Sequence, residues 1–382
     1  MLTEDKLVSS HTAPRSRRPL LVATPELQTY RRSTGIGRVL HSLCDEWGTR
    51  VQLIDVGFAT IPLPITRNFP YGLRYTIQPD LILLPRLTGA QALRHTCGIP
   101  RIVIVHDIGI VDHPGDRQTM DFLTCHSIRA SFHGLRYADR IIAVSHFTSD
   151  RIRAHQPELD GKIRVIPNGV ARSFLDDTPD RTLARERVRR YMQQPLNGPI
   201  VLNVGSELPR KNLGLLIEAL RLLKNDHPQL CLIKVGASGG PKWRQATIDT
   251  IRRNGLSPER DVLLVDSVGD DMLNSFYAAA DVFVSTSLYE GFGLPALEAL
   301  AVGTPVVVSN CGALPEVVGD AGLIVAPVAP AVARAIARVI TEPGDHTTAV
   351  RRARAAEFNW ARAAEEYLAT MWQVKAVFDE HE

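Results

Sequence analysis

Apolar residues gather in short uninterrupted runs, separated by longer stretches in which they recur with helical spacing. Runs without apolar–polar alternation are typical of strands buried on both faces, and amphipathic stretches such as 117–137 are typical of helices. In the first half, the expected strands are 19–25, 51–57, 80–85, 101–107, 140–145 and 163–167. This half therefore predicts a parallel sheet covered by helices on both faces.

The alternation of apolar runs and amphipathic stretches is interrupted at 171–197, a charged stretch bracketed by prolines, and resumes after it. In the second half, the expected strands are 199–205, 230–236, 261–266, 281–287, 305–310 and 322–327. Each is followed by a helical segment, for example 213–224. The chain thus predicts an α/β fold of two doubly wound, Rossmann-like domains that face each other across a cleft.

The expected boundaries follow these changes of pattern. They are a flexible polar lead-in (1–18), a first domain (19–175), a linker (176–197), a second domain (198–357) and a closing amphipathic helix (358–382). Ligands of such sheets bind at the carboxyl ends of the strands, and clefts between domains favour pockets. Functional residues are therefore expected just after strands.

Composition narrows the class of protein. A hydrophobic fraction of 45% and a charged fraction of 22% are typical of a globular chain. No apolar run approaches the roughly 18 residues of a membrane span, and the first residues lack the apolar core of a signal peptide. The five cysteines are scattered, odd in number and without a CxxC pair, which favours reduced thiols in the cytoplasm over disulfides or a zinc site.

The formal net charge of +3 is too small to indicate a nucleic-acid partner. Residues 1–180 carry 22 basic against 18 acidic side chains, and residues 181–382 carry 22 against 23. The mildly basic first half leaves two interpretations open, an ordinary solvated surface and a peripheral contact with anionic membrane or acidic ligands.

The stretch "STSLYEGFGLPALEALAVGTPVVVSN" (285–310) carries the strongest candidate chemistry. Glu290 and Glu298 flank Gly-Phe-Gly, where glycines let backbone amides approach a ligand, and Pro295 suits a first helical turn. A helix N-terminus attracts anions, and the Glu298 side chain leans back toward it. The stretch is either an ordinary strand–loop–helix with two solvated acids or a site for an anion flanked by hydroxylated groups, as in a sugar nucleotide.

Three further motifs follow expected strands. "SELPRKN" (206–212) supplies Arg210 and Lys211, two cations that could neutralise a diphosphate, or else a solvated basic loop. "VHD" (105–107) places His106 at a strand end, where it is either functional or structural. "GIGR" (35–38) is a tight turn for packing or part of a ligand loop, and its arginine is as readily a surface residue as a ligand.

Several other functions lack their signatures. There is no Asp-x-Asp to hold Mg²⁺ beside a strand end. There is no GxxxxGK[ST] phosphate loop and no early GxGxxG with a downstream acid. The histidines and the cysteine of 95–107 have the wrong spacing for zinc.

The stretch 290–325 resembles the donor-site signature of retaining glycosyltransferases of the GT-B fold, the large group called family 4. The resemblance covers nearly the whole chain, because "GIGRVLHSL", "VHD", "ADRIIAVSHFTSDRI", "IRVIPNGV", "VGSELPRKNLGLLIEAL" and "FYAAADVFVSTS" match its pattern in the right order. It implies the GT-B arrangement of two domains, with the C-terminal helix crossing back to the first domain.

The resemblance also implies residue roles. Glu298 would hold the nucleotide ribose, Glu290 the hydroxyls of the donor sugar, and His106 would lie near the reacting bond. Ser206 departs from the family, which often has an arginine there. The implied catalytic residues are His106, Glu290 and Lys211, and the implied donor-binding residues are Gly35, Gly37, Gly205, Ser206, Arg210, Lys211, Glu290, Gly291, Phe292, Gly293, Leu294 and Glu298.

The expected activity is transfer of a hexose of mannose or glucose type, with retention, from a UDP- or GDP-linked sugar. The acceptor would be a glycan, a lipid-linked sugar or a small molecule, and neither metal nor cofactor is expected. Two alternatives stay open: an epimerase or hydrolase of sugar nucleotides on the same fold, and a non-catalytic binder of sugar nucleotides.

Overall fold

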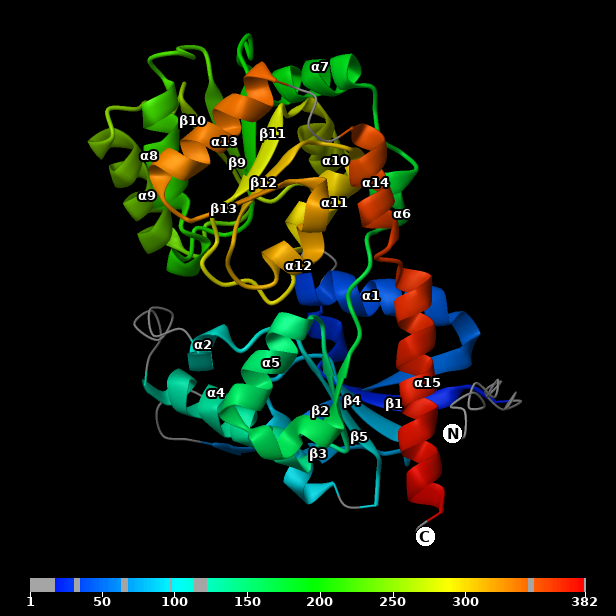
Figure 1. Ribbon diagram of the computed structural model, residues 1–382. Helices are drawn as coiled ribbons and strands as arrows, with labels where there is room; N and C mark the ends of the chain where they lie inside the picture. Colours follow the sequence, from blue (N-terminus) through cyan, green and yellow to red (C-terminus); the bar gives the residue numbers. More distant parts are fainter. Residues whose placement is uncertain are drawn as a thin grey trace, which may run out of the picture.

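A computed structural model describes residues 18–30, 35–62, 68–96, 98–112, 122–342 and 347–380. It has two α/β domains, one above the other in Figure 1. Helix α1 (Gly35–Trp47) lies on the side of the first domain that faces the second. The predicted fold class is confirmed.

In the described chain, the first sheet has seven strands in the order β3-β2-β1-β4-β5-β6-β7. They are β1 (Leu20–Pro25), β2 (Val51–Pro62), β3 (Asn68–Arg74), β4 (Leu81–Leu84), β5 (Arg101–Val105), β6 (Arg140–Ala143) and β7 (Ile163–Val165). All pairs are parallel except β2 with β3. The six predicted strands are present, whereas the antiparallel hairpin to β3 was not predicted.

The second sheet has six strands among the described residues, in the order β10-β9-β8-β11-β12-β13, and all its pairs are parallel. They are β8 (Ile200–Val204), β9 (Cys231–Val235), β10 (Val262–Val265), β11 (Val282–Ser285), β12 (Val306–Ser309) and β13 (Leu323–Val325). All six were predicted. Most of their residues are buried, as expected for strands covered on both faces.

Helices cover both sheets (Figure 1). The first domain has α1, α2 (Gly109–Asp112), α4 (Phe122–Gly134) and α5 (His146–His155). The second has α8 (Leu213–Leu223), α9 (Pro241–Arg253), α10 (Asp270–Ala279), α11 (Leu294–Val302), α12 (Leu314–Val318), α13 (Ala329–Thr341) and α14 (Thr348–Ala356). Of the predicted helix 117–137, residues 117–121 lie outside the described residues.

Helix α6 (Arg172–Leu175) ends the expected first domain, and the expected linker (176–197) contains helix α7 (Arg181–Met192). Helix α7 packs on α10 of the second domain. Arg185 of α7 donates to the Ala279 carbonyl at 3.2 Å and pairs with Asp281 at 2.6 Å. The charges and prolines of this stretch indicated a linker, but the apolar face of α7 packs on the second domain.

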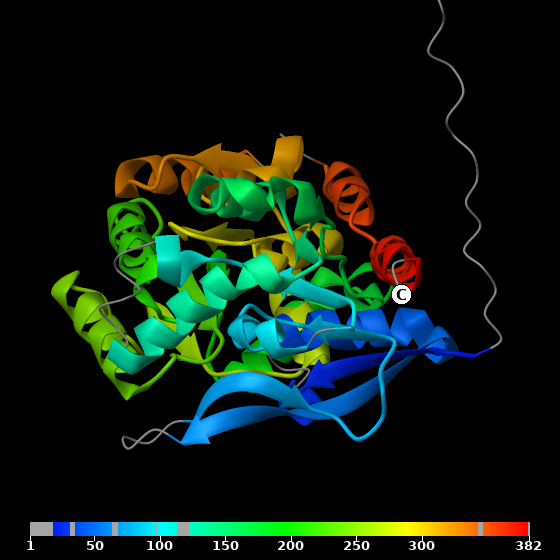
Figure 2. The same cartoon turned by 90° about the horizontal axis from the view of Figure 1, so that it is seen from below.

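The closing helix α15 (Trp360–Asp379) lies beside α1, as Figures 1 and 2 show. The Trp47 indole N–H donates to the Ala364 carbonyl at 3.0 Å, and the Trp47 ring packs edge-on against Tyr367 with centroids 6.3 Å apart. Both rings are buried, so the helix joins the core of the first domain. The expected crossing back is confirmed.

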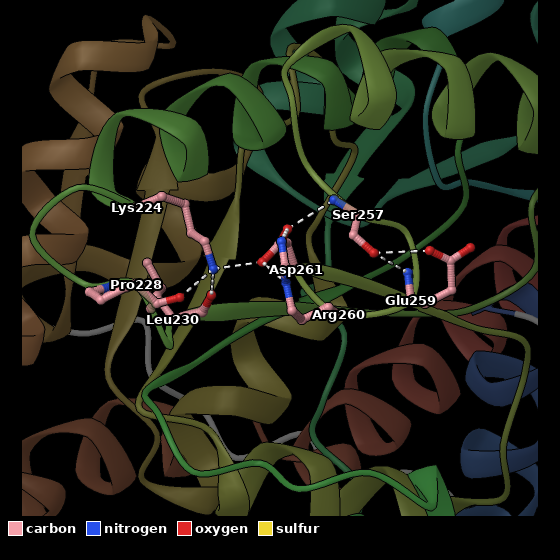
Figure 3. A network of polar contacts seen from close by, with 7 residues as sticks. All are labelled: Lys224, Pro228, Leu230, Ser257, Glu259, Arg260 and Asp261. Carbon is pink, nitrogen blue, oxygen red and sulfur yellow. Dashed lines mark hydrogen bonds and ion pairs between the residues drawn. The ribbon is translucent and has the colours of Figure 1, made fainter.

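A buried carboxylate stabilises the second sheet at the edge where its strands begin (Figure 3). Asp261, directly before β10, accepts from Lys224 Nζ at 2.7 Å and from the Ser257 N–H at 2.9 Å. Arg260 adds a contact at 3.2 Å. Although burial opposes ionisation, these partners lower the pKa of Asp261 to about 2.

We expect Asp261→Asn to lower the free energy of unfolding by about 2 kcal/mol at neutral pH, because a pKa unit corresponds to about 1.4 kcal/mol. The folded pKa lies below the unfolded one, so this stability is present above about pH 4 and is lost as the pH falls toward about 2. Denaturant unfolding of the wild type and the variant from pH 7 down to about pH 2 measures both the difference and its loss. Asp266→Asn, at the other end of β10 and 79% exposed, is the control. Equal losses in both variants would contradict this account.

Candidate functional site

The site lies where the order of the second sheet reverses. Strands β8 and β11 are neighbours, and each continues at its carboxyl end into a loop that carries predicted residues. The loop after β8 holds Gly205, Ser206, Arg210 and Lys211, and the loop after β11 holds Glu290 and the Gly-Phe-Gly turn. This is the position at which open α/β sheets bind their ligands.

The glycine turn fits tightly between the two domains. Gly293 precedes α11 with a φ of 103°, a conformation that other residues rarely adopt. At Gly291 a Cβ atom would lie 1.7 Å from the carbonyl oxygen of His106, so only glycine fits. The turn therefore brings α11 into contact with the strand end that carries His106.

Lys211 and Glu290 form an ion pair of 2.6 Å between the two loops, and the Ser287 hydroxyl donates to the same Glu290 oxygen at 2.8 Å. The Glu290 side chain is 12% exposed. Burial favours its neutral form, but the charges of Lys211 and Arg210 outweigh burial and lower its pKa below the ordinary value. Glu290 is thus an ionised acceptor beside a cation.

The backbone joins the same two loops. The Leu288 N–H donates to the Arg210 carbonyl at 2.8 Å, and the Arg210 guanidinium donates to the Tyr289 carbonyl at 3.3 Å. Gly205 leaves β8 with a φ of 155°, and a Cβ atom at Gly236 would lie only 2.5 Å from the Gly205 carbonyl oxygen. Gly205 and Ser206 are therefore held at the base of the loop that carries the two cations.

Glu298 is buried one turn inside α11, 4% exposed. Its Oε2 accepts from the Tyr277 hydroxyl at 2.8 Å, and its Oε1 accepts from Arg38 at 2.7 Å. Arg38 also pairs with Asp270 at 2.9 Å. Burial raises the pKa of Glu298 above its ordinary value, and the opposing effects of Arg38 and Tyr277 offset burial only in part.

His106 directly follows β5, and its carbonyl oxygen lies against Gly291 of the second domain. Its Nε2 lies 2.9 Å from the Pro85 carbonyl oxygen. A carbonyl only accepts, so Nε2 carries the proton and Nδ1 of the neutral ring is an acceptor. Burial lowers the pKa of His106, which favours the neutral ring. Asp107 accepts from the Gly109 N–H at 3.0 Å and shapes the following turn.

The N-terminus of α5 adds a domain contact that the sequence interpretation missed. The Ser145 and Thr148 hydroxyls donate to the Gly291 carbonyl at 2.6 and 3.1 Å. The His146 and Phe147 N–H groups donate to the Glu316 carboxylate at 2.9 and 3.2 Å. The Ser-x-x-Thr pattern of a helix N-cap was visible in the sequence, but its partner in the other domain was not.

The remaining predicted residues lie around this centre. Gly35 begins α1 with open space where a Cβ would be, and Gly37 is buried in the same helix. Phe292 is buried against Phe358, with ring centroids 5.7 Å apart, so its backbone alone faces the turn. The sequence did not single out Tyr277, Asp270 and Ser287, although Tyr277 and Ser287 fall in its "FYAAADVFVSTS" motif.

Two pockets adjoin these residues. One of about 210 Å³ is lined by Arg38, Asp270, Leu294 and Glu298 together with residues 169–174. The other, of about 220 Å³, belongs to the first domain and is lined by His106, Asp107 and mainly aliphatic side chains. The aliphatic lining residues are Ile36, Leu87, Ile108, Ile110, Val111 and Ile128.

Within the ranges that the structure describes, no three His, Cys, Asp or Glu side chains come together in a way that could hold a metal ion. Among the same residues, no helix has the length and apolar character of a membrane span.

The two halves of the chain match two glycosyltransferase families. Residues 33–174 match Glycosyltransferase Family 4, and residues 184–356 match Glycosyl transferases group 1. The chain belongs to the group 1 and family 4 glycosyltransferases, as its motifs predicted.

Curated relatives agree with this family. O-antigen chain mannosyltransferase B of Escherichia coli is 35% identical over 59% of this chain and 57% of its own length. D-inositol 3-phosphate glycosyltransferase of Corynebacterium efficiens is 36% identical over 43% of this chain and 39% of its own length. The chain thus spans about half the length of the curated relatives it matches.

Solved structures share the fold. Sucrose-phosphate synthase from Thermosynechococcus elongatus superposes with a TM-score of 0.73 at 22% identity, over 94% of this chain and all of that chain. Anabaena Alr3699/HepE in complex with UDP-glucose has a TM-score of 0.69 at 20% identity, over 92% of this chain and 99% of that chain. At such identities the likeness establishes the GT-B fold.

Proposed function

We propose that the protein transfers a hexose from a nucleotide diphosphate sugar to an acceptor hydroxyl, with retention of the anomeric configuration. The observation that carries the proposal is the pairing of Lys211 with Glu290 at 2.6 Å beside the N-terminus of α11. A cation, an ionised acceptor and a helix-terminal amide at one turn fit a diphosphate with a sugar attached. The names of the relatives, a mannosyltransferase and a structure bound to UDP-glucose, support a donor of this class.

In the proposed reaction, the bond between the sugar C1 and the diphosphate oxygen breaks, and a bond forms between C1 and the acceptor oxygen on the same face. The acceptor proton passes to the departing phosphate oxygen. Lys211, Arg210 and the Leu294 N–H at the start of α11 would stabilise the negative charge that develops on the diphosphate. Lys211 pairs with Glu290 at 2.6 Å, which places its ammonium beside the carboxylate proposed to hold the sugar.

Glu290 and His106 would position the sugar. Glu290 stays ionised and accepts hydrogen bonds from sugar hydroxyls, while neutral His106 offers Nδ1 as an acceptor from the opposite domain. Glu298 would accept from the ribose. The acceptor would enter through the first-domain pocket beside His106, whose aliphatic lining suits an acceptor with an apolar part. The contact of α5 with Gly291 and Glu316 supports closure of the domains around both substrates.

Transfer is expected to persist in excess EDTA. Lys211, Arg210 and the Leu294 N–H supply the charge stabilisation that a metal ion supplies in other transferases. Initial rates with and without chelator, on enzyme freed of divalent ions, test this expectation. Strict dependence on added Mg²⁺ or Mn²⁺ would mean that the diphosphate is held differently.

A donor panel tests the proposed function. Release of nucleoside diphosphate is measured from UDP-, GDP- and ADP-linked glucose and mannose, each with methyl and octyl glycosides as acceptors. The proposal expects one donor base to dominate and release to rise when an acceptor is added. Release that does not respond to any acceptor would favour a hydrolase, and binding without release would favour a non-catalytic binder.

A further inference from the structure

Arg38 reaches from the first domain into the second. It lies one turn into α1, and its two terminal nitrogens contact Glu298 of α11 at 2.7 Å and Asp270 of α10 at 2.9 Å. The Arg38 side chain is 24% exposed and the Glu298 side chain 5%. This pairing joins residues 260 positions apart and lines the pocket of about 210 Å³.

We propose that Arg38 is a positioning residue that orients Glu298 for ribose hydroxyls, so that nucleotide affinity depends on contact between the two domains. The inference rests on the proposed function, in which Glu298 holds the ribose. It gives a role to the arginine of the "GIGR" motif, which the sequence left open and which forms the first turn of α1, not the tight turn or loop expected from the sequence.

The hydrogen bonds of Glu298 leave room for a ligand. Tyr277 occupies one lone pair of Oε2, and Arg38 occupies one lone pair of Oε1. A carboxylate has about four acceptor positions, so each oxygen can accept one more hydrogen bond. Two neighbouring ribose hydroxyls present two donors at the spacing of a carboxylate. Arg38 and Tyr277 thus fix the carboxylate plane without blocking it.

The charge balance explains why the guanidinium matters. Glu298 is buried and lies near Asp270, a second carboxylate, and both effects favour its neutral form. Asp45 and His41 of α1 and Arg172 of α6 also line the pocket, and Tyr277 donates from α10. Arg38 contacts both carboxylates directly. Its removal would leave Glu298 buried beside Asp270, and a protonated Glu298 loses acceptor capacity.

A further hydrogen-bond donor supports the binding of a ligand beside Arg38. Among the described residues, the Nε–H of Arg38 is buried without a hydrogen-bond partner. Buried donors are rarely left unpaired, and the adjoining pocket is where the nucleotide is proposed to bind. We therefore expect the nucleotide to accept from this N–H as well, which would hold α1 against the bound ligand.

The test is calorimetric titration with UDP and GDP at several pH values between about 5.5 and 8.5, for the wild type and for Arg38→Ala and Arg38→Lys. The ratio of variant to wild-type Kd is compared at each pH, since this ratio cancels the titration of the nucleotide phosphate. Arg50→Ala, which removes an exposed arginine that pairs with Glu365, is the matched control. Thermal melting confirms that each variant is folded.

For Arg38→Ala we expect the Kd ratio to be about tenfold or more at the acid end and to fall as the pH rises, because Glu298 then ionises without help. Arg38→Lys should restore a ratio that varies little with pH, and Arg50→Ala should stay near one. A ratio near one for Arg38→Ala would overturn the inference. A large ratio that is independent of pH and not rescued by lysine would also overturn it, because it would show a purely structural contact.

Glu298→Gln, titrated alongside, separates the inference from the proposed function. If Glu298→Gln weakens nucleotide binding while Arg38→Ala does not, the inference fails and the role of Glu298 stands. If Glu298→Gln binds as the wild type does, the proposed role of Glu298 fails, and the inference fails with it.

Discussion

Lys211→Ala is expected to lower turnover by about 10²–10³-fold, as the loss of a group that stabilises charge in the transition state does. Affinity for the free nucleoside diphosphate should fall by about 10- to 150-fold, which corresponds to about 1.5–3 kcal/mol for a charge-assisted contact. The reason is the position of the Lys211 ammonium, which pairs with Glu290 at 2.6 Å beside the turn that begins α11.

A second signature distinguishes this role from damage to the fold. Lys211 lowers the pKa of Glu290, so in Lys211→Ala the pKa of Glu290 should rise and residual activity should fall further as the pH is lowered. Lys242→Ala, which removes an exposed lysine of the same domain, is the control. Unchanged nucleotide affinity in Lys211→Ala would remove the residue from the proposed diphosphate site.

Glu290→Ala and Glu298→Ala are expected to impair nucleotide binding and turnover in different ways. Glu298→Ala should weaken the donor and the free nucleoside diphosphate to a similar degree, because both carry the ribose. Glu290→Ala should leave nucleoside diphosphate affinity intact or slightly improved, because it releases Lys211 to the diphosphate. Its turnover should nonetheless fall strongly, since placement of the sugar governs the rate.

Calorimetric titration of both variants with the free nucleotide, beside initial rates, separates these cases. Equal loss of nucleotide affinity in the two variants would refute the division of roles and leave the donor site standing. If Glu290 and Glu298 were instead solvated acids on an ordinary loop, either substitution would change the free energy of binding by no more than about 0.5 kcal/mol.

Much of this architecture could be predicted from local sequence. Twelve strands of the described chain stand out as uninterrupted apolar runs, and the turn at 290–294 stands out because glycines and a proline have few other uses between a strand and a helix. The hairpin to β3 was missed, since antiparallel pairing at a sheet edge leaves no apolar run. Helix α7 was missed because its apolar face is short and its charges dominate.

The residues of the site could be predicted from the sequence, but their contacts with one another could not. Glu290, Glu298 and Lys211 follow strands, which places them at one edge of a sheet. The sequence could not show that Arg38 crosses to Glu298 or that Tyr277 donates to the same carboxylate. Such contacts depend on how two domains and three helices pack, and local periodicity carries no information about them.

The balance of products tests the central claim most directly. Wild-type protein is incubated with the donor that the panel selects and with its acceptor, and nucleoside diphosphate and glycosylated acceptor are both quantified by mass spectrometry. The account predicts one hexose added to the acceptor for each nucleoside diphosphate released, with both products lost in Lys211→Ala. Nucleoside diphosphate formed without any glycosylated acceptor, or a donor sugar altered without nucleotide release, would contradict it.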